Sequence, residues 1–424
     1  MATYSKTIIV LAAFTVGLVA LAACQSESEP AATESPTETP STIVAPAPPA
    51  EPTATPESTL PSATIRQPTF PPPPELDRSI ASVEMSDIIF DRFDGTTTRL
   101  SSASNALIDR LRDAIKPVYE PNYEDPGVDE WLEPDDLVVG YVSDAGQAYA
   151  YPIKFLNFHE LVNDEIDGVP VIITYCPLCG SGVIFDRRID GETLVFGNTS
   201  ALYNSDMVMF DHKTGSYWFQ TGGEAVVGTL TGSILKPLAS SIMGWGEWLE
   251  IYPTTKILSR SQGLGTRPSQ YLRDPFSTYA NFINEGPGRY PFPVDDDLVS
   301  DVLRPAEIVL AVAIGDIERA YPPGRIGDAA INDEIDGGQI VVFSRGDRQM
   351  ATVFSPVLDS DDRQLEFEFV DNAFKDTQTG SEWNLAGIAV SGELEGTRLT
   401  PLPSRRAFWF SISISNQNIE VYGQ

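Results

Sequence analysis

The chain has 424 residues, of which 42% are hydrophobic, so it is long enough to bury a core and to form more than one domain. Its 60 acidic and 28 basic residues give a formal net charge of −32. This excess argues against nucleic acid as a partner and against electrostatic docking on anionic lipid, because both require Lys and Arg. With three Cys and two His, each of these residues can be considered singly.

Residues 1–23 have the pattern of an export signal. Lys6 precedes an apolar run that is too short for a comfortable membrane span and that ends in small residues before Cys24. This lipobox-like pattern predicts a lipoprotein signal peptide that is cut before Cys24. The lipid on Cys24 would then anchor an extracytoplasmic protein to the cell membrane. The alternative is an ordinary signal peptide with an incidental Cys.

Residues 24–80 and 81–132 differ in composition. The first range, after Cys24, is rich in Pro, Thr, Ser and Glu and has few large apolar residues, which predicts a disordered linker. In the second range, Asp94-Gly95 between two apolar runs predicts a hairpin, and the spacing over Ser104–Lys116 predicts a helix that Pro117 stops.

The rest of the chain contains an internal duplication. Asn163–Gly168 matches Asn332–Gly337, and Asp211–Trp218 matches Asp376–Trp383 in the same order. We therefore expect a first repeat over residues 133–272, a linker over 273–303 and a degenerate second repeat over 304–424.

The repeats have the composition of a mainly β protein. Short runs rich in β-formers occupy 169–175, 182–185 and 193–197, whereas Phe155–Val162 and Trp245–Tyr252 are predicted short helices. The expected fold is a β-rich α+β arrangement of two tandem, pseudo-symmetric, sandwich- or barrel-like lobes.

The chemically distinctive residues all fall in the first repeat. With Gly168 aligned to Gly337, Cys176 faces Arg345 and Cys179 faces Arg348. The two His residues also lack counterparts in the second repeat. The first repeat is therefore interpreted as the functional one, and the second as its structural partner.

Three interpretations of Cys176-Pro-Leu-Cys179 remain open. A structural disulfide suits an exported protein, but so short a loop gains only about 2 kcal/mol from closure. A reversible dithiol uses the same spacing for thiol exchange, with Cys176 and Cys179 as the catalytic residues of a thiol–disulfide-type oxidoreductase. A thiolate site for Cu or Zn needs a further ligand, for which His159 is preferred over His212.

The chain resembles the domain-of-unknown-function 3179 family. The similarity runs from about Ile88 to Phe410. It rests on Asn157–Asp164, on the Thr174–Ser181 string around the Cys pair and on further pieces at 214–218, 245–248, 252–259 and 273–276. The family has no settled activity. Some of its members are described as selenoproteins, and if that trait applies to Cys179 or Cys176, the resemblance implies redox chemistry or soft-metal ligation.

The resulting hypothesis is an exported lipoprotein whose Cys pair acts in thiol redox chemistry or binds Cu or Zn with His159. Its partners would be the membrane, through the lipid on Cys24, and a protein that exchanges electrons or metal. The competing hypothesis is a non-catalytic binding module with a local disulfide or a structural zinc site.

Overall fold

A computed structural model describes residues 66–286, 289–290 and 292–424. The predicted signal peptide, Cys24 and most of the predicted linker lie outside these residues. The described part is mainly β, as expected, and its residues belong to one compact unit. None of the helices within it is both long and apolar enough to cross a bilayer.

Two sheets surround the Cys loop. The six-stranded sheet has the order β14-β13-β12-β11-β1-β2, and the eight-stranded sheet has the order β29-β19-β18-β28-β8-β7-β6, with β15 also paired to β8. The strands of the first are β1 (Ile88–Asp91), β2 (Thr97–Arg99), β11 (Phe196–Tyr203), β12 (Asp206–Asp211), β13 (Tyr217–Phe219) and β14 (Glu224–Val227). Those of the second are β6 (Leu161–Ile166), β7 (Val169–Cys176), β8 (Ser181–Asp186), β15 (Lys236–Leu238), β18 (Ile308–Ile314), β19 (Ile317–Tyr321), β28 (Arg405–Phe408) and β29 (Glu420–Val421).

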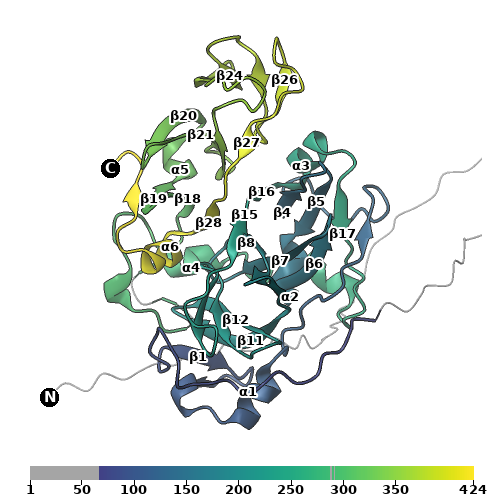
Figure 1. Cartoon of the computed structure of the whole chain (residues 1–424), viewed down its shortest axis with the longest axis vertical. Coiled ribbons are helices and arrows are strands. Elements are labelled where there is room, and N and C mark those ends of the chain that lie inside the picture. The colour runs from purple at the N-terminus through teal and green to yellow at the C-terminus, as the bar shows by residue number, and fades with distance from the viewer. Residues whose placement is uncertain (1–65, 287–288, 291) are drawn as a thin grey trace, which may run out of the picture. The chain divides into compact units, whose positions relative to one another are not determined.

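The remaining strands form smaller sheets, and the helices are short (Figure 1). These strands are β3 (Tyr123–Glu124), β4 (Leu137–Val142), β5 (Ala148–Pro152), β16 (Ser241–Gly244) and β17 (Lys256–Leu258); β20 (Ala329–Ile335), β21 (Gly338–Arg345), β22 (Met350–Ser355) and β27 (Thr400–Pro401); β23 (Phe367–Val370), β24 (Ala373–Asp376), β25 (Glu382–Trp383) and β26 (Ala389–Ser391); and β9 (Arg188–Ile189) with β10 (Glu192–Thr193). The helices are α1 (Asn105–Leu111), α2 (Ile153–His159), α3 (Trp245–Ile251), α4 (Tyr279–Asn284), α5 (Pro323–Ile326) and α6 (Trp409–Ser415), with 3-10 turns η1 (Leu100–Ser102), η2 (Pro268–Leu272) and η3 (Asp296–Leu298).

The local structure of the two repeats agrees in register. Ile172 of β7 pairs with Phe185 of β8, and Val341 of β21, 169 positions later, pairs with Phe354 of β22. The turn Asp167-Gly168 has positive φ at both residues, as does the turn Asp336-Gly337, a pattern that favours a tight hairpin. The duplication seen in the sequence therefore corresponds to repeated hairpins.

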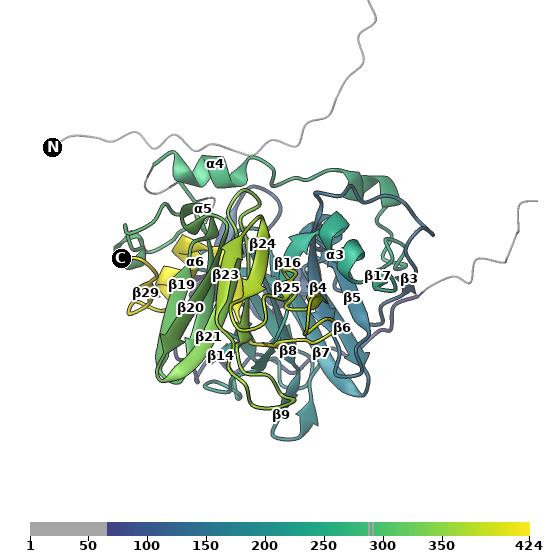
Figure 2. The same ribbon diagram turned by 90° about the horizontal axis from the view of Figure 1, so that it is seen from above.

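The repeats do not close into two separate lobes, so that part of the expectation is not confirmed. Strand β28 of the second repeat pairs with β8 of the first, at Arg406 and Gly182, and so places strands of both repeats in one sheet. Figure 1 shows β8 next to β28, and Figure 2 shows β19 of the second repeat and β7 of the first on opposite sides of β8. The predicted linker 273–303 contains α4 and η3, and its Ile283 is buried against the core around the Cys pair.

Two predicted helices end earlier than expected. The helix expected over Ser104–Lys116 is α1, which already ends at Leu111. The helix expected over Phe155–Val162 is α2, which ends at His159, and Leu161 already begins strand β6. Glu160 between them adopts a positive φ of 56°, which interrupts the helix. Val162 is consequently buried in the sheet opposite Ile173 rather than on a helix face.

A buried aspartate organises the same turn in each repeat. Trp218 Nε1 donates to Asp211 Oδ2 at 3.0 Å, and Trp383 Nε1 donates to Asp376 Oδ2 at the same distance. Each carboxylate also accepts a backbone N–H, from Thr214 or Thr379, at 2.6 Å. The shared Asp-x-x-Thr-Gly-Ser-x-Trp pattern thus forms an identical, fully bonded turn.

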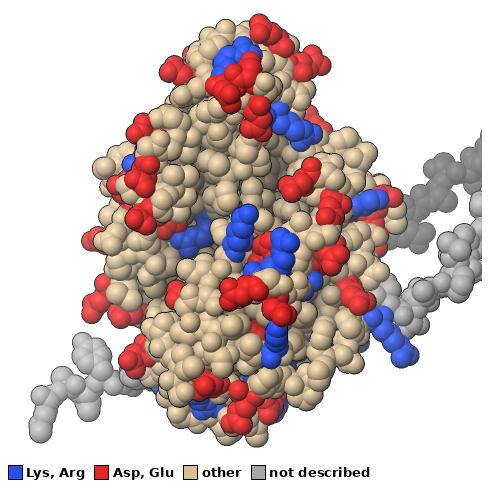
Figure 3. Space-filling view, viewed as in Figure 1, with Lys and Arg blue, Asp and Glu red and all other residues tan. Residues whose placement is uncertain are grey.

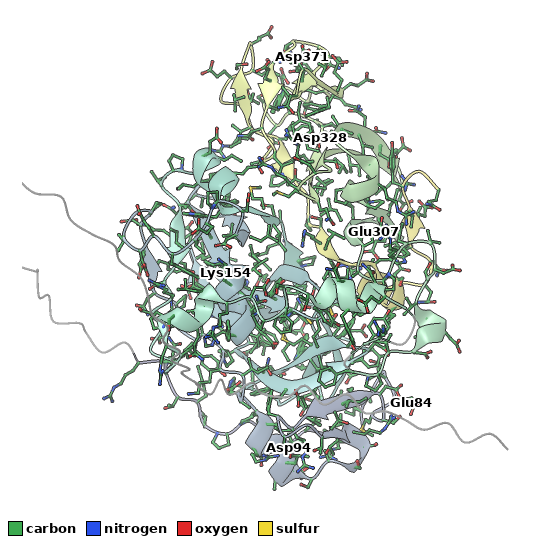
Figure 4. All side chains as sticks on the ribbon, turned by 180° about the vertical axis from the view of Figure 1, so that it is seen from behind. Glu84, Asp94, Lys154, Glu307, Asp328 and Asp371 are labelled. Atoms are coloured by element: carbon green, nitrogen blue, oxygen red, sulfur yellow. The ribbon has the colours of Figure 1, made fainter. Side chains whose placement is uncertain are left out.

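We expect Asp211→Ala and Asp376→Ala each to lower the free energy of unfolding by about 2 to 4 kcal/mol, because each leaves a buried indole N–H and a backbone N–H without an acceptor. Chemical denaturation monitored by fluorescence would measure the loss. Glu84, labelled in Figure 4, is exposed and has no side-chain hydrogen bond or ion pair within the described residues, and Glu84→Ala is the control, with a change within about 0.5 kcal/mol. A loss for only one of the two buried positions would contradict the equivalence of the turns.

Candidate metal centre at the Cys loop

The two thiols sit in a tight turn between paired strands. Strand β7 ends at Cys176, β8 begins at Ser181, and Cys179 N donates to Cys176 O at 3.2 Å. Gly180 has φ of 58°, and a Cβ there would lie 3.1 Å from the ring of Phe408. The turn therefore needs glycine both for its backbone angle and for the close approach of the second repeat.

Asp206 is the third member of the cluster. One ligand atom from each of Cys176, Cys179 and Asp206 lies within 4.8 Å of the other two, and all three residues are at most 1% exposed. Asp206 begins β12 directly after Asn204 and Ser205, which both have positive φ. This strained turn brings the Asp206 carboxylate to the thiols, although Asp206 lies thirty positions after Cys176 in the sequence.

Hydrogen bonds from both repeats fix the Asp206 carboxylate. Met207 N donates to Oδ1 at 2.7 Å, and Thr221 Oγ1 donates to Oδ2 in a short bond. Ser411 of α6 donates to Oδ2 at 3.4 Å, and Phe408 N donates to the Cys179 carbonyl at 2.7 Å. The second repeat therefore completes the surroundings of the first repeat's Cys pair.

Three buried polar side chains of the first repeat form a chain of hydrogen bonds next to the Cys loop. Gln220 Nε2 donates to Thr174 Oγ1 at 2.7 Å, and Ser181 Oγ donates to Gln220 Oε1 at 2.8 Å. In the second repeat, Phe343 and Met350 occupy the strand positions of Thr174 and Ser181. The polar network is thus specific to the first repeat, like the Cys pair.

The counterparts of the Cys residues make surface ion pairs instead. Arg345 lies 3.4 Å from Asp328, and Arg348 lies 3.2 Å from Glu247 of the first repeat. Figure 3 shows such basic side chains among more numerous acidic ones on the face seen in Figure 1. The two arginines at these positions can act neither as thiols nor as metal ligands.

The electrostatics of the cluster keep the thiols protonated. Burial raises the pKa of Cys176 and of Cys179 above the ordinary value, and the negative charge of Asp206 adds to the effect on both. Burial also raises the pKa of Asp206, although hydrogen bonds from Thr221 and the two thiols act in the opposite direction. Among the described residues, no Lys or Arg side chain bonds to any of these three groups.

Glu160 is a second carboxylate near the cluster. Its Oε2 accepts a hydrogen bond from Asn198 Nδ2 at 2.5 Å, and its side chain is partly buried. Burial raises its pKa to about 7, and the charge of Asp206 adds to this rise. The positive φ of Glu160 marks it as a strained residue at the edge of the site.

The structure does not place His159 in the cluster that contains the two thiols. His159 Nδ1 bonds to the Lys116 carbonyl at 2.7 Å, and Nε2 bonds to Tyr271 Oη at 2.8 Å. The imidazole stacks on Phe155, and burial lowers its pKa to about 4. Both ring nitrogens are therefore occupied among residues of another core cluster, and the ligand-type side chain that lies beside the thiols is that of Asp206.

His212 is also separate from the Cys pair. Its Nε2 bonds to Tyr119 Oη at 2.8 Å, its ring lies 4.7 Å from that of Phe70, and burial lowers its pKa to about 4. Asp113 lies 3.9 Å from the same nitrogen. The weak prediction of His212 as a ligand is therefore not supported by its position, and Cys24 lies outside the described residues.

Sequence reasoning missed Asp206 and Glu160. Both belong to the first repeat. For Glu160, a residue-by-residue comparison of the repeats gives a usable signal, because the equivalent position of the second repeat, after Asp328, is Ala329. Asp206 has no such signal, since its importance depends on a hairpin that brings it to the Cys loop.

The fold and site together define a mainly β protein with a buried dithiol–carboxylate cluster. Residues 112–415 match the family described as protein of unknown function (DUF3179), and the chain belongs to this family. No curated protein matches the chain, and no solved structure matches it.

We expect alkylation of Cys176 and Cys179 to be slow in the native, reduced, metal-free protein at pH 7, because burial disfavours the reactive thiolate. The rate should rise as the pH passes 9, and unfolding in guanidinium should abolish the protection. Mass spectrometry of the two peptides after timed iodoacetamide treatment would measure it. Rapid native labelling at pH 7 would contradict the buried, protonated state.

We expect Glu160→Gln to stabilise the metal-free protein at pH 8 by about 1 to 3 kcal/mol. The folded-state pKa of Glu160 is raised to about 7 from 4.5, so the wild type loses stability as pH rises from 4.5 to 7, and the variant should not. Urea denaturation between pH 4 and 8 would test this. The exposed Glu165→Gln is the control, and parallel pH profiles for wild type and Glu160→Gln would refute the effect.

Proposed function

We propose that the protein binds a thiophilic metal ion, zinc in the first place, through Cys176, Cys179 and Asp206. The observation that carries this proposal is the convergence of two thiols and one carboxylate within 4.8 Å in the core. Zn²⁺ in proteins usually has four ligands, so these three donors would leave one position for another ligand. The proposed set replaces the one that included His159.

Charge balance supports a cation. A buried carboxylate beside two potential thiolates is unfavourable unless a positive charge compensates it. A divalent ion would do so while displacing the thiol protons, and its affinity would therefore increase with pH. The raised pKa values of Cys176 and Cys179 describe the metal-free state in which these protons are retained.

The donor types favour zinc over the alternatives. Ca²⁺ and Mg²⁺ prefer oxygen ligands and would not use two sulfurs, whereas Cu(I) prefers thiolates and would not need Asp206. Zn²⁺ accepts both sulfur and carboxylate oxygen. The requirement for Asp206 thus separates zinc from copper(I) in the experiment below.

Export and anchoring through Cys24 complete the proposal. A lipid on Cys24 and the Pro-rich linker would hold the metal site outside the cytoplasm at the membrane surface. A protein partner that delivers or removes metal would then meet it there.

Thiol redox chemistry is the second candidate, favoured by the proximity of the two sulfur atoms, which lie within 4.8 Å of each other. In this reaction an external disulfide would accept two electrons and two protons and be reduced to two thiols, while Cys176 and Cys179 form an S–S bond and cease to be metal ligands. The burial of both sulfurs and their raised pKa values disfavour rapid exchange with an external thiol or disulfide.

The test is metal titration of the reduced, chelator-treated protein with Zn²⁺ and Co²⁺. We expect one ion per chain, Co²⁺–thiolate absorption, and an affinity that falls by about 100-fold or more in Cys176→Ser, Cys179→Ser and Asp206→Asn. Circular dichroism would confirm that each variant is folded.

His159→Gln and His212→Gln serve as the matched controls, and both should bind Zn²⁺ within about threefold of the wild type. Loss of binding in His159→Gln with a native fold would restore the original ligand set. A protein that takes up no metal when reduced, but cycles between dithiol and disulfide, would replace metal binding by the redox function. Tight copper(I) binding that is indifferent to Asp206→Asn would exclude zinc.

A further inference from the structure

The second repeat leaves open a sheet edge that the first repeat covers. In the first repeat, Val118 pairs in parallel with Val162 of β6. Val118 N donates to the Leu161 carbonyl at 2.9 Å, and Asn163 N donates to the Val118 carbonyl at 2.8 Å. The segment that follows α1 therefore acts as an additional strand on the outer side of β6.

The corresponding backbone groups of β20 lack such a partner. At the offset between the repeats, Ala330 is the counterpart of Leu161. Asn332 is the counterpart of Asn163. The hairpin closes at the pair Ile335–Gly338, so the backbone groups of every second residue face β21, and those of Ala330 and Asn332 face outward. Within the described residues, no group bonds to the Ala330 carbonyl or to Asn332 N. Strand β20 is also the end strand of its sheet, whose order is β20-β21-β22-β27 (Figure 1).

The exposure of the two edges differs accordingly. Val162 and Asn163 are at most 1% exposed, whereas Asn332 is exposed. The two asparagine side chains nevertheless make the same bond. Asn332 Nδ2 donates to the Phe367 carbonyl at 2.8 Å. Asn163 Nδ2 donates to the equivalent Phe196 carbonyl at 2.9 Å. The bonding around these asparagines is therefore the same in the two repeats, and what differs is the covering strand.

The first half of β20 carries none of the features that usually protect an edge strand. Proteins block open edges with Lys, Pro, a bulge or a covering segment. Residues 329–332 read Ala-Ala-Ile-Asn, without Pro or a charged side chain, and their pairing with β21 is regular. The small Ala side chains leave room for a second strand to approach. An apolar side chain of that strand, in the place of Val118, would lie beside Ile331 on a buried apolar cluster.

The surroundings of the open edge are acidic. Glu366 and Glu368 of this region flank Phe367, whose backbone N–H and C=O both bond to the Asn332 side chain. Glu334, on β20 itself, is exposed like these two glutamates. None of the three carboxylates has an ion pair within the described residues. A strand that carries Lys or Arg is therefore favoured here by charge complementarity.

We propose that the outer edge of β20 pairs with an extended segment of a partner protein, which runs parallel to β20 and has an apolar residue flanked by Lys or Arg. In such strand addition, backbone hydrogen bonds supply affinity and side chains supply selectivity. The template is residues 115–119, Ile-Lys-Pro-Val-Tyr, which cover the equivalent edge of the first repeat. A second copy of a chain with a net charge of −32 would instead bring like charges together. The surface includes none of the side chains of the proposed metal site.

Fluorescence anisotropy with the full chain tests this pairing, with a labelled peptide that has the sequence of residues 115–119 and a Lys added at each end. We expect saturable binding with one site per chain at low ionic strength. N-methylation of the valine nitrogen should weaken binding by about tenfold or more, because this N–H would be the donor to the Ala330 carbonyl. N-methylation of the tyrosine nitrogen should change binding by less than about threefold, because that N–H would point away from β20. In the first repeat, Tyr119 N likewise bonds elsewhere, to Gln67 Oε1.

A second peptide, with Glu in place of both added Lys, tests the role of charge. It should bind about tenfold or more weakly than the Lys-flanked peptide. The difference should shrink as salt is added, because interactions between exposed charges are screened.

Ala330→Pro is the matching change in the chain. It removes an outward N–H and places a ring on the edge, so it should weaken binding of the Lys-flanked peptide by about tenfold or more. Ala330→Ser keeps the N–H and is the control, with binding within about twofold of the wild type. Circular dichroism would show whether both variants are folded. If Ala330→Pro is not, the comparison of the two N-methylated peptides decides.

Absence of binding by the Lys-flanked peptide would overturn the proposal, as would equal binding of the two N-methylated peptides or undiminished binding to a folded Ala330→Pro variant. Sedimentation velocity of the chain alone tests the other occupant. A dimer that Ala330→Pro abolishes would assign the edge to a second copy and overturn the proposal of a partner protein. None of these results affects the zinc titration, so failure of the docking edge and failure of the metal site are distinguishable.

Discussion

The pairing of β28 with β8 is the contact on which the site depends. It joins the two repeats in one sheet, and the same segment supplies Phe408, whose N–H bonds to the Cys179 carbonyl. The helix that follows supplies Ser411, which bonds to Asp206. The first repeat therefore holds the two thiols and the Asp206 carboxylate, while the second completes their surroundings.

Burial of polar side chains in the first repeat contributes less to folding than burial of apolar side chains would. Thr174, Ser181 and Gln220 bond to one another beneath the loop, where the second repeat has apolar side chains at the strand positions of the first two. An apolar replacement is thus compatible with the fold. Retention of the polar set in one repeat is consistent with a role in positioning Cys176 and Asp206.

The sequence by itself determined the β class, the duplication, the Asp94-Gly95 hairpin, α3 and the location of the Cys pair, because these depend on local periodicity, turn residues and repeated strings. Only the tertiary structure decided the end of α2 and the sharing of a sheet between the repeats. It also decided that Asp206, rather than His159, lies beside the two thiols. Periodicity does not report long-range pairing: His159 shares the first repeat with Cys176 but bonds elsewhere, whereas Asp206 reaches the thiols through a strained turn.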